Sequence, residues 1–425
     1  MNISGGLKIK LRLKPSFLGK IALILILLVT PLFTACCSGA LGVGWAGTLV
    51  VDDTLYVATM QGELSAYDLT NARAPLWTLT LGNGAALYGP PVVSGDYIYI
   101  GTASGVVYKL KSDNTEAART IDLGSPIVGG VAVGLDMVFV GTSEGIFYAL
   151  DADDLSQEWR YPEVGKLSDR IWGTPTVDVT GADTAVVYFG AFDHKLYALD
   201  QDGEEVWTSP FEAGGAIASK PLVYNGVVYF GAFDRKFYAL DQTDGSAAWT
   251  SPFAGGNWFW TEAIVYDNTD NDTADGTIFV GCLDHNVYAL DPVTGAQKGK
   301  YTIDGPITAP PVIAVLPGEN KSLGDTDDSD GVQTLDDDDV EMLIVASGAS
   351  TGSVYALDPA NLAGTPKWAS PFTMNEQVQS PMSVHIKIDG DLVYQFLYVY
   401  GRGSTLTARW LTTGGDSGWD IKTSE

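Results

Sequence analysis

The chain has 425 residues and a formal net charge of −28, from 52 acidic against 24 basic side chains. This acidic excess argues against nucleic-acid binding, because phosphates would be repelled and the sequence has no basic patch. It is compatible with basic protein partners, with metal cations, or simply with solubility in a salty habitat.

The first 35 residues have the features of an export signal. They contain five cations and no acidic residue, and residues 21–29 form an apolar run that is followed by Pro31. The apolar run is shorter than the roughly 20 residues that span a membrane. We therefore predict that residues 1–35 direct the chain out of the cytoplasm.

The end of this signal, residues 32–37 (LFTACC), resembles a bacterial lipobox with Cys36 as the lipidated residue. The alternative is ordinary signal cleavage near residues 38–40, which would discard Cys36 and Cys37. If Cys36 is lipidated, residues 36–44 form a short tether, and the rest of the chain lies close to the membrane surface.

One motif recurs along the rest of the chain. Residues 186–201 (VVYFGAFDHKLYALDQ) are almost repeated at 227–242 (VVYFGAFDRKFYALDQ), and looser copies begin at residues 55, 98, 138, 278, 343 and 397. A period of roughly 20–50 residues is typical of stacked repeats, in which each unit needs its neighbours to bury its apolar face. Each copy reads as two alternating strands joined by a Gly/Asp-rich turn.

Two further strands complete each unit. A short apolar run precedes the motif and is often opened by a proline, which belongs at the first residue of a strand because it lacks a donor. Four units carry a tryptophan after the motif, and we predict a fourth strand that ends in this apolar side chain: Trp77, Trp207, Trp249 and Trp368. Residues 45–425 therefore predict an all-β, eight-bladed β-propeller of four-stranded antiparallel blades.

The sequence Tyr-Ala-Leu-Asp at 238–241, followed by Asp244-Gly245 and Trp249, resembles the PQQ-like repeat. This family builds the eight-bladed propellers of quinoprotein alcohol dehydrogenases and of BamB-type outer-membrane assembly lipoproteins. The resemblance implies the fold over most of the chain. It does not imply an activity, because the repeated residues are structural.

Two acidic insertions, residues 267–276 and 318–341, fall between the first and second strands of their blades, so we expect surface loops. Clustered carboxylates are the ligands that calcium prefers. The spacing departs from that of an EF-hand, and a solvated acidic loop is the alternative. The candidate calcium ligands are Asp325, Asp327, Asp328 and Asp330.

Blade topology places the turns between second and third strands on the same face as the connections between blades. We call this the channel-mouth face and expect the functional pocket there. Its candidate residues are Tyr88, Arg170, Trp172, Lys220, Trp258, Trp260 and Glu262 from the connections, and His194, Arg235 and His285 from the turns. An aromatic mouth with a few charges suits a flat conjugated ligand or a protein anchor. The alternative is that Trp172 and Trp260 only cap the central channel.

The sequence gives little support to catalysis. The three histidines fall in separate blades, there is no Ser-His-Asp spacing, and Cys282 stands where other units have Ala191 or Ala232, as a buried apolar residue would. Quinoprotein dehydrogenases, as the resemblance implies, need a calcium-held PQQ and usually a disulfide of adjacent cysteines. The only adjacent cysteines here, Cys36 and Cys37, lie at the signal junction.

We therefore predict an exported, non-catalytic scaffold of the cell envelope that binds a protein partner, needs no cofactor and is anchored by an N-terminal lipid. The resemblance points to the outer-membrane β-barrel assembly machinery as a candidate partner. A PQQ- and calcium-dependent dehydrogenase and a cell-surface adhesion or polymer-binding protein are the alternatives.

Overall fold

The computed structural model describes residues 47–69, 75–182, 184–267, 276–316, 340–374, 376–389, 392–402, 405–411 and 418–422. Residues 45–425 form one compact unit, and none of the described residues lies in a helix that could cross a membrane. The export signal, the tether and Cys36 lie outside the described residues, so these predictions are untested.

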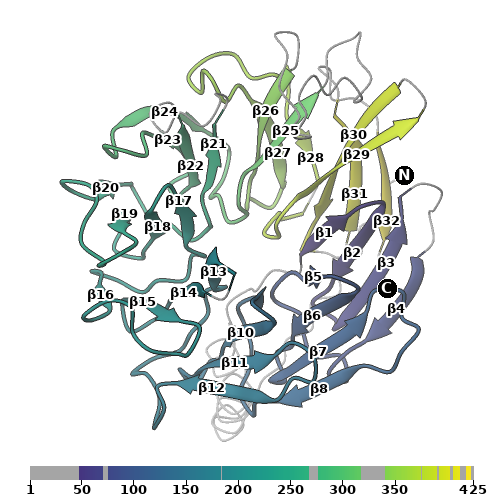
Figure 1. Ribbon diagram of the computed structural model, residues 1–425. Coiled ribbons are helices and arrows are strands. Elements are labelled where there is room, and N and C mark those ends of the chain that lie inside the picture. The colour runs from purple at the N-terminus through teal and green to yellow at the C-terminus, as the bar shows by residue number, and fades with distance from the viewer. Residues whose placement is uncertain are drawn as a thin grey trace, which may run out of the picture. The chain divides into compact units, whose positions relative to one another are not determined.

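The described chain forms eight antiparallel sheets of four strands, arranged around a central axis (Figure 1). In each sheet the order in space is the order in sequence, from the innermost strand outward, which confirms the predicted eight-bladed propeller. The first four blades are blade 1, β1 (Thr48–Val51), β2 (Thr54–Ala58), β3 (Glu63–Asp68) and β4 (Pro75–Thr80); blade 2, β5 (Val92–Ser94), β6 (Tyr97–Gly101), β7 (Val106–Lys111) and β8 (Arg119–Asp122); blade 3, β9 (Ala132–Gly134), β10 (Met137–Gly141), β11 (Phe147–Asp151) and β12 (Gln157–Tyr161); and blade 4, β13 (Thr176–Gly181), β14 (Thr184–Gly190), β15 (Lys195–Asp200) and β16 (Phe211–Glu212).

The remaining four blades follow in the same order. They are blade 5, β17 (Leu222–Tyr224), β18 (Val227–Gly231), β19 (Lys236–Asp241) and β20 (Phe253–Ala254); blade 6, β21 (Ile264–Tyr266), β22 (Thr277–Gly281), β23 (Asn286–Leu290) and β24 (Gln297–Thr302); blade 7, β25 (Val312–Leu316), β26 (Val340–Ala346), β27 (Ser353–Leu357) and β28 (Phe372–Thr373); and blade 8, β29 (Ser383–Asp389), β30 (Leu392–Tyr400), β31 (Thr405–Trp410) and β32 (Gly418–Lys422).

The hydrophobic core lies between neighbouring blades. The second and third strands of a blade are covered on both faces and are apolar almost throughout, as in β18, whereas outer strands such as β4 alternate between exposed and half-buried residues. One core cluster, for example, joins Leu196 and Trp207 of blade 4 to Phe230 and Leu240 of blade 5. A single blade therefore cannot bury its own apolar faces.

Prolines precede the inner strands of four blades, as predicted. Pro91, Pro175, Pro221 and Pro311 stand directly before β5, β13, β17 and β25. The acidic insertions also fall where expected, between β21 and β22 and between β25 and β26. Most of their residues (268–275 and 318–339), including the four candidate calcium ligands, lie outside the described residues, and residues 340 and 341 begin β26.

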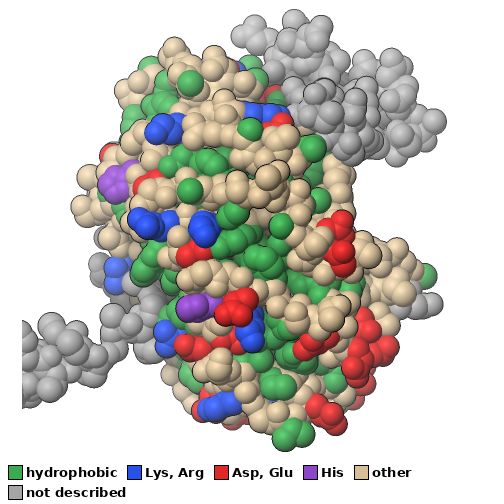
Figure 2. Space-filling view, turned by 90° about the vertical axis from the view of Figure 1, so that its left-hand side faces the viewer, with side chains coloured by type: hydrophobic (Ala, Val, Ile, Leu, Met, Phe, Trp, Pro, Cys, Tyr) green, Lys and Arg blue, Asp and Glu red, His purple; other side chains and the backbone are tan. Residues whose placement is uncertain are grey.

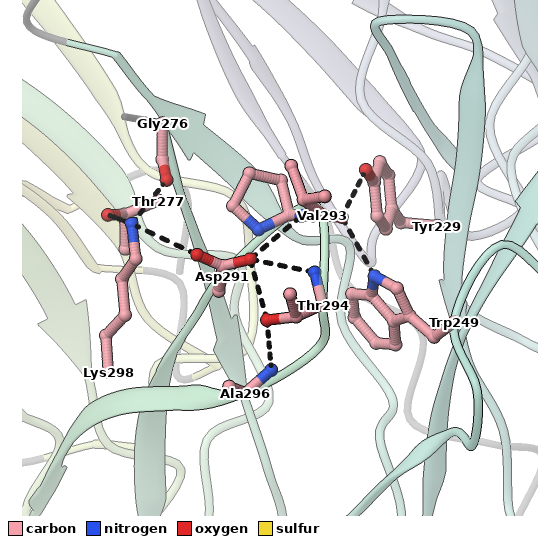
Figure 3. A network of polar contacts seen from close by, with 10 residues as sticks. Tyr229, Trp249, Gly276, Thr277, Asp291, Val293, Thr294, Ala296 and Lys298 are labelled. Carbon is pink, nitrogen blue, oxygen red and sulfur yellow. Dashed lines mark hydrogen bonds and ion pairs between the residues drawn. The ribbon is translucent and has the colours of Figure 1, made fainter. Parts of the chain in front are cut away.

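A tryptophan–glycine contact joins consecutive blades. The indole Nε1 of Trp249 in blade 5 donates a hydrogen bond to the carbonyl oxygen of Pro292 in blade 6, at 2.8 Å (Figure 3). The same ring covers Gly295, where a Cβ atom would lie 2.6 Å from the indole Cδ2. Gly295 has φ 72°, so glycine is needed here both for space and for backbone conformation.

The contact recurs at the two preceding blade junctions. Trp159 bonds to the carbonyl oxygen of Gln201 and lies against Gly203, and Trp207 bonds to that of Gln242 and lies against Gly245. Trp159 was not among the tryptophans predicted from the sequence. The prediction that every such tryptophan lies in a strand was also wrong: Trp207, Trp249 and Trp368 lie in bends before the short strands β16, β20 and β28, whereas Trp77 lies in β4.

Two junctions lack the tryptophan, and a leucine replaces the glycine there. In blade 2 Arg119 stands at the position of the tryptophan, opposite Lys109 in the strand register. The turn of blade 3 that follows β11 carries Leu155, which is buried and has φ 64°. In blade 6 Gly299 holds that position, and the buried Leu362 of blade 7 lies against it. The leucine side chain occupies the volume that an indole fills elsewhere.

Blade 8 packs against blade 1 and closes the ring. Leu55 and Val57 share a core cluster with Tyr398 and Leu406, and His385 Nε2 lies 3.1 Å from Asp53 Oδ1. Strand β32 is the outer strand of blade 8 and pairs with β31.

Candidate functional site: the channel-mouth face

Five of the predicted residues meet at the mouth of the central channel. The five are Tyr88, Trp172, Lys220, Trp260 and Glu262. They line one small cavity of about 90 Å³, and residues of the remaining blade connections complete its lining. Each lies one to four residues before the start of an inner strand or before the proline that opens it, so the blade connections carry these side chains to the axis.

Below the mouth, the channel is lined by the inner strands. Its cavity of about 580 Å³ is bordered by Pro91, Pro311 and the aliphatic residues that follow them, and its charged lining residues are Lys220 and Glu262. Lys220 Nζ lies 3.4 Å from Glu262 Oε2, and this half-buried ion pair bridges blades 5 and 6. Lys220, the cation among the described residues that line the mouth, is therefore neutralised by Glu262.

A row of aromatic rings extends outward from the mouth across blades 3 to 6. Phe233 stacks on Trp258 with ring centroids 4.5 Å apart and on Trp260 at 5.0 Å, and its edge meets Phe192. Phe192 in turn contacts Trp172. We call Trp172, Phe192, Phe233, Trp258 and Trp260 the aromatic ridge.

Arg170 and Trp258 mark the two ends of this ridge. The Arg170 guanidinium carbon lies 4.3 Å from the ring centre of Trp172 and 4.5 Å from that of Phe192, an arrangement typical of cation–π contacts. Trp258 is 43% exposed although its ring stacks on Phe233. Phe192 and Phe233 were not predicted as site residues, although the repeated Gly-Ala-Phe-Asp of blades 4 and 5 contains both.

The other three predicted residues lie at the tips of consecutive turns on the same face. His194, Arg235 and His285 are exposed and do not line the mouth cavity. All three have left-handed backbone, with φ of 72°, 69° and 73°. Blades 1, 2, 3 and 7 have glycine at this position: Gly62, Gly105, Gly145 and Gly352.

An aspartate holds each of these turns in place. Asp234 accepts hydrogen bonds from the backbone N–H of Gly214 and Lys236, each at 3.1 Å, and from the Tyr238 hydroxyl. Asp284 accepts from Gly256 N–H at 2.7 Å and from the Tyr288 hydroxyl at 2.6 Å. Burial would raise the pKa of Asp284, but these hydrogen bonds outweigh it and lower the pKa below the ordinary 3.8. The aspartates are therefore structural.

The two propeller faces differ in charge across blades 4 to 6. Figure 2 shows the rim of these blades: the exposed histidines and most of the lysine and arginine side chains lie toward one face, and many acidic side chains toward the other. The turns between third and fourth strands, on the opposite face, supply acidic residues: Asp200, Asp202, Asp241, Asp244 and Asp291.

The described residues offer no assembled metal or redox centre. Within the described parts of the chain, no three His, Cys, Asp or Glu side chains come together as a group that could hold a metal. Cys282 is fully buried, and burial raises its thiol pKa to about 12. The mouth cavity of about 90 Å³ is smaller than the roughly 300–1,000 Å³ typical of organic-ligand pockets, whereas the channel cavity of about 580 Å³ lies within that range.

Fold and repeat together define the class: an eight-bladed β-propeller of PQQ-like repeats with an aromatic channel mouth. The chain belongs to the outer membrane protein assembly factor BamB family, whose model matches residues 39–120, 61–191 and 169–370.

Solved structures show the same fold. BamB from Moraxella catarrhalis is 18% identical with a TM-score of 0.59, over 86% of this chain and 94% of that one. The computationally designed Ika8 protein is 12% identical with a TM-score of 0.61, over 87% of this chain and 96% of that one. None of the curated proteins compared with the chain matches it.

Proposed function

We propose that the protein is an exported, non-catalytic scaffold of the cell envelope that holds a protein partner on its channel-mouth face. The observation that carries this proposal is the aromatic ridge. Large aromatic side chains at a surface are the residues on which protein interfaces most often depend, because each buries much apolar area with few rotatable bonds. Trp258, still 43% exposed while stacked on Phe233, is a pre-ordered anchor of this kind.

The family supports a role in the envelope, and BamB-type proteins are outer-membrane assembly factors by name. We extend to this chain a partner in the outer-membrane β-barrel assembly machinery and an anchor at Cys36. Replacing Cys36 with Ser is expected to move the protein from the membrane fraction to the soluble fraction after cell lysis. A membrane-bound Cys36→Ser variant would contradict the lipid anchor.

Site-specific photo-crosslinking tests the partner face. A photoreactive amino acid at Trp258 is expected to give an adduct with one envelope protein in intact cells. The matched control is Val293, which is 62% exposed in a turn on the opposite face. Equal adducts from both positions, or none from position 258, would contradict the proposal. Adducts with polysaccharide instead of protein would support an adhesion or polymer-binding role.

A PQQ-dependent dehydrogenase is the alternative that the repeat family allows. Titration of the purified protein with PQQ and calcium, followed by the absorbance of the quinone, separates the two functions. A saturable spectral change accompanied by alcohol-dependent reduction of a dye would establish the enzyme. We expect no saturable change, because the channel lining offers one lysine, already paired with Glu262, for a cofactor that carries several carboxylates.

A further inference from the structure

We propose that the partner segment is acidic, and that the turns of blades 4 to 6 bind its carboxylates while the aromatic ridge takes an apolar side chain. This inference rests on the proposed function and specifies the chemistry of the partner. It depends on three observations: the placement of the cations, the hydrogen bonds that the nearby carboxylates accept, and the backbone strain at the tips of the turns.

The cations of these blades gather on one face. Lys195, Arg235 and Lys236 stand on consecutive turns, and Arg170 and Lys220 lie inside them along the ridge and mouth. Lys236 lies 4.0 Å from Asp234, a distance at which the ion pair is weak, and the structure records no ion pair for Lys195 or Arg235 among the residues it describes. Arg170 lies 3.9 Å from Asp169 and Lys220 pairs with Glu262, so Lys195 and Arg235 are the cations of this group that have no ion pair among the described residues.

The acidic residues between these cations are already engaged. Asp193 accepts the Tyr197 hydroxyl at 2.7 Å, and Asp234 and Asp284 accept backbone N–H groups and tyrosine hydroxyls. Their lone pairs are directed into the blade. The exposed side chains at the tips of these turns are His194, Arg235 and His285, and a cation such as Arg235 attracts carboxylates.

The turn tips keep large side chains where the backbone favours glycine. A left-handed conformation costs a non-glycine residue about 1–2 kcal/mol, and four other blades avoid that cost with glycine. His194, Arg235 and His285 do not pack into the core, since all three are exposed. Backbone strain at residues whose side chains do not pack in the core indicates that these side chains serve a function at the surface.

The same geometry disfavours a membrane as the ligand. A bilayer is an extended plane, whereas charge attraction is screened beyond about 8 Å at physiological salt. Around the same face the neighbouring blades present Glu144 and Asp304, which an anionic bilayer would also approach. A short acidic segment can lie over blades 4 to 6 alone.

The test uses the full-length protein and a short fluorescent peptide that carries aspartate and glutamate around one leucine. A matched peptide has asparagine and glutamine instead. Fluorescence anisotropy should show binding of the acidic peptide at low salt, weaker binding at high salt, and no binding of the amide peptide. Equal binding of the two peptides would overturn the proposal.

The decisive variant replaces all three turn residues with glycine: His194→Gly, Arg235→Gly and His285→Gly. Because glycine suits the observed φ, we expect this variant to melt at or above the wild-type temperature, while its affinity for the acidic peptide falls about tenfold or more. A second variant, Lys195→Gln with Lys236→Gln, should also lose affinity. The control is Lys111→Gln, a partly exposed cation of blade 2 paired with Glu116, which should bind as wild type does.

Two further outcomes separate this inference from the function on which it rests. If the triple-glycine variant binds the acidic peptide as tightly as wild type, or if vesicles of phosphatidylglycerol bind while the peptide does not, the acidic-segment proposal is wrong. A protein adduct at position 258 would then still support the scaffold function. Loss of both the adduct and peptide binding would overturn both proposals.

Discussion

Trp249 of blade 5 and Gly295 of blade 6 form a contact in which neither residue tolerates much change. The indole donates its N–H to the carbonyl oxygen of Pro292, and its ring lies so close to Gly295 that a Cβ there would approach the indole Cδ2 to 2.6 Å. The turn that carries Gly295 is itself fixed by Asp291 (Figure 3). In each such contact, the turn of one blade therefore forms the surface on which the tryptophan of the preceding blade packs.

Adding one methyl group at Gly295 should destabilise the propeller strongly. Gly295→Ala combines a left-handed alanine with a steric overlap, and we expect a loss of about 2–4 kcal/mol in the free energy of unfolding. Gly226 is the matched control, because it has φ 73° but nothing within 4 Å of an added Cβ. Gly226→Ala should cost only about 1 kcal/mol. Urea unfolding of both variants measures the difference, and equal losses would show that the indole contact contributes nothing.

Glycine should have opposite effects at two left-handed positions. Leu155→Gly removes a buried side chain that fills the missing tryptophan's volume, and we expect a net loss of about 2–3 kcal/mol. Arg235→Gly only relieves strain at an exposed tip, so its stability should lie within about 1 kcal/mol of wild type and on the stable side. Thermal melts of the two single variants test this. A Leu155→Gly protein as stable as wild type would refute the idea that Leu155 fills the space left by the tryptophan that blade 2 lacks.

Acid should weaken the turn that holds Gly295. Burial raises the pKa of Asp291. Hydrogen bonds from Thr294 and the nearby positive charge of Lys298 outweigh burial and lower this pKa below the ordinary 3.8. A carboxyl group whose pKa is lower in the folded state stabilises the fold at pH values above its unfolded-state pKa. This stabilisation is lost as the pH falls through the folded-state pKa.

Asp291→Asn should therefore cost about 1.5–3 kcal/mol at neutral pH, and the gap from wild type should narrow below pH of about 4. Denaturant unfolding across this range measures the gap. Glu158→Gln, an exposed change on β12, should show no such pattern. A gap that stays constant from neutral to acid pH would rule out the charged carboxylate as the cause.

The thiol of Cys282 should be inert in the folded protein. Burial raises its pKa to about 12 and leaves it without solvent contact, so little thiolate forms near neutral pH. In a Cys36→Ser, Cys37→Ser background, an aromatic disulfide reagent should label Cys282 only as fast as the protein unfolds. Rapid labelling of the native state would mean that the junction of blades 5 and 6 opens readily. Cys282→Ala should fold normally, because Ala191 and Ala232 hold the same position in blades 4 and 5.

Much of the fold could be predicted from the sequence because the repeat encodes it locally. Strand alternation, the proline before an inner strand and the Asp-to-Gly turn each depend on a few adjacent residues. Trp159 was missed although it follows Asp151 at the same spacing as Trp249 follows Asp241. Trp207 was misplaced because a bend and a strand of similar composition look alike in sequence.

The site was predicted in part for the same reason. Topology alone assigns Tyr88, Trp172 and Trp260 to one face, so their meeting at the mouth could be anticipated. Phe192 and Phe233 could not be separated from structural repeat residues, because the motif Gly-Ala-Phe-Asp gives no sign that its phenylalanine leaves the core for the surface.

The sequence by itself determined the number of blades, the order of their strands and the face on which each turn lies, since these follow from period and connectivity. Only the tertiary structure decided which side chains from different blades meet: Trp249 with Gly295, Lys220 with Glu262, and Phe233 with Trp258 and Trp260. Such contacts depend on the rotation between neighbouring sheets, which no single repeat specifies. The angle arises from the packing of all the blades into a closed ring.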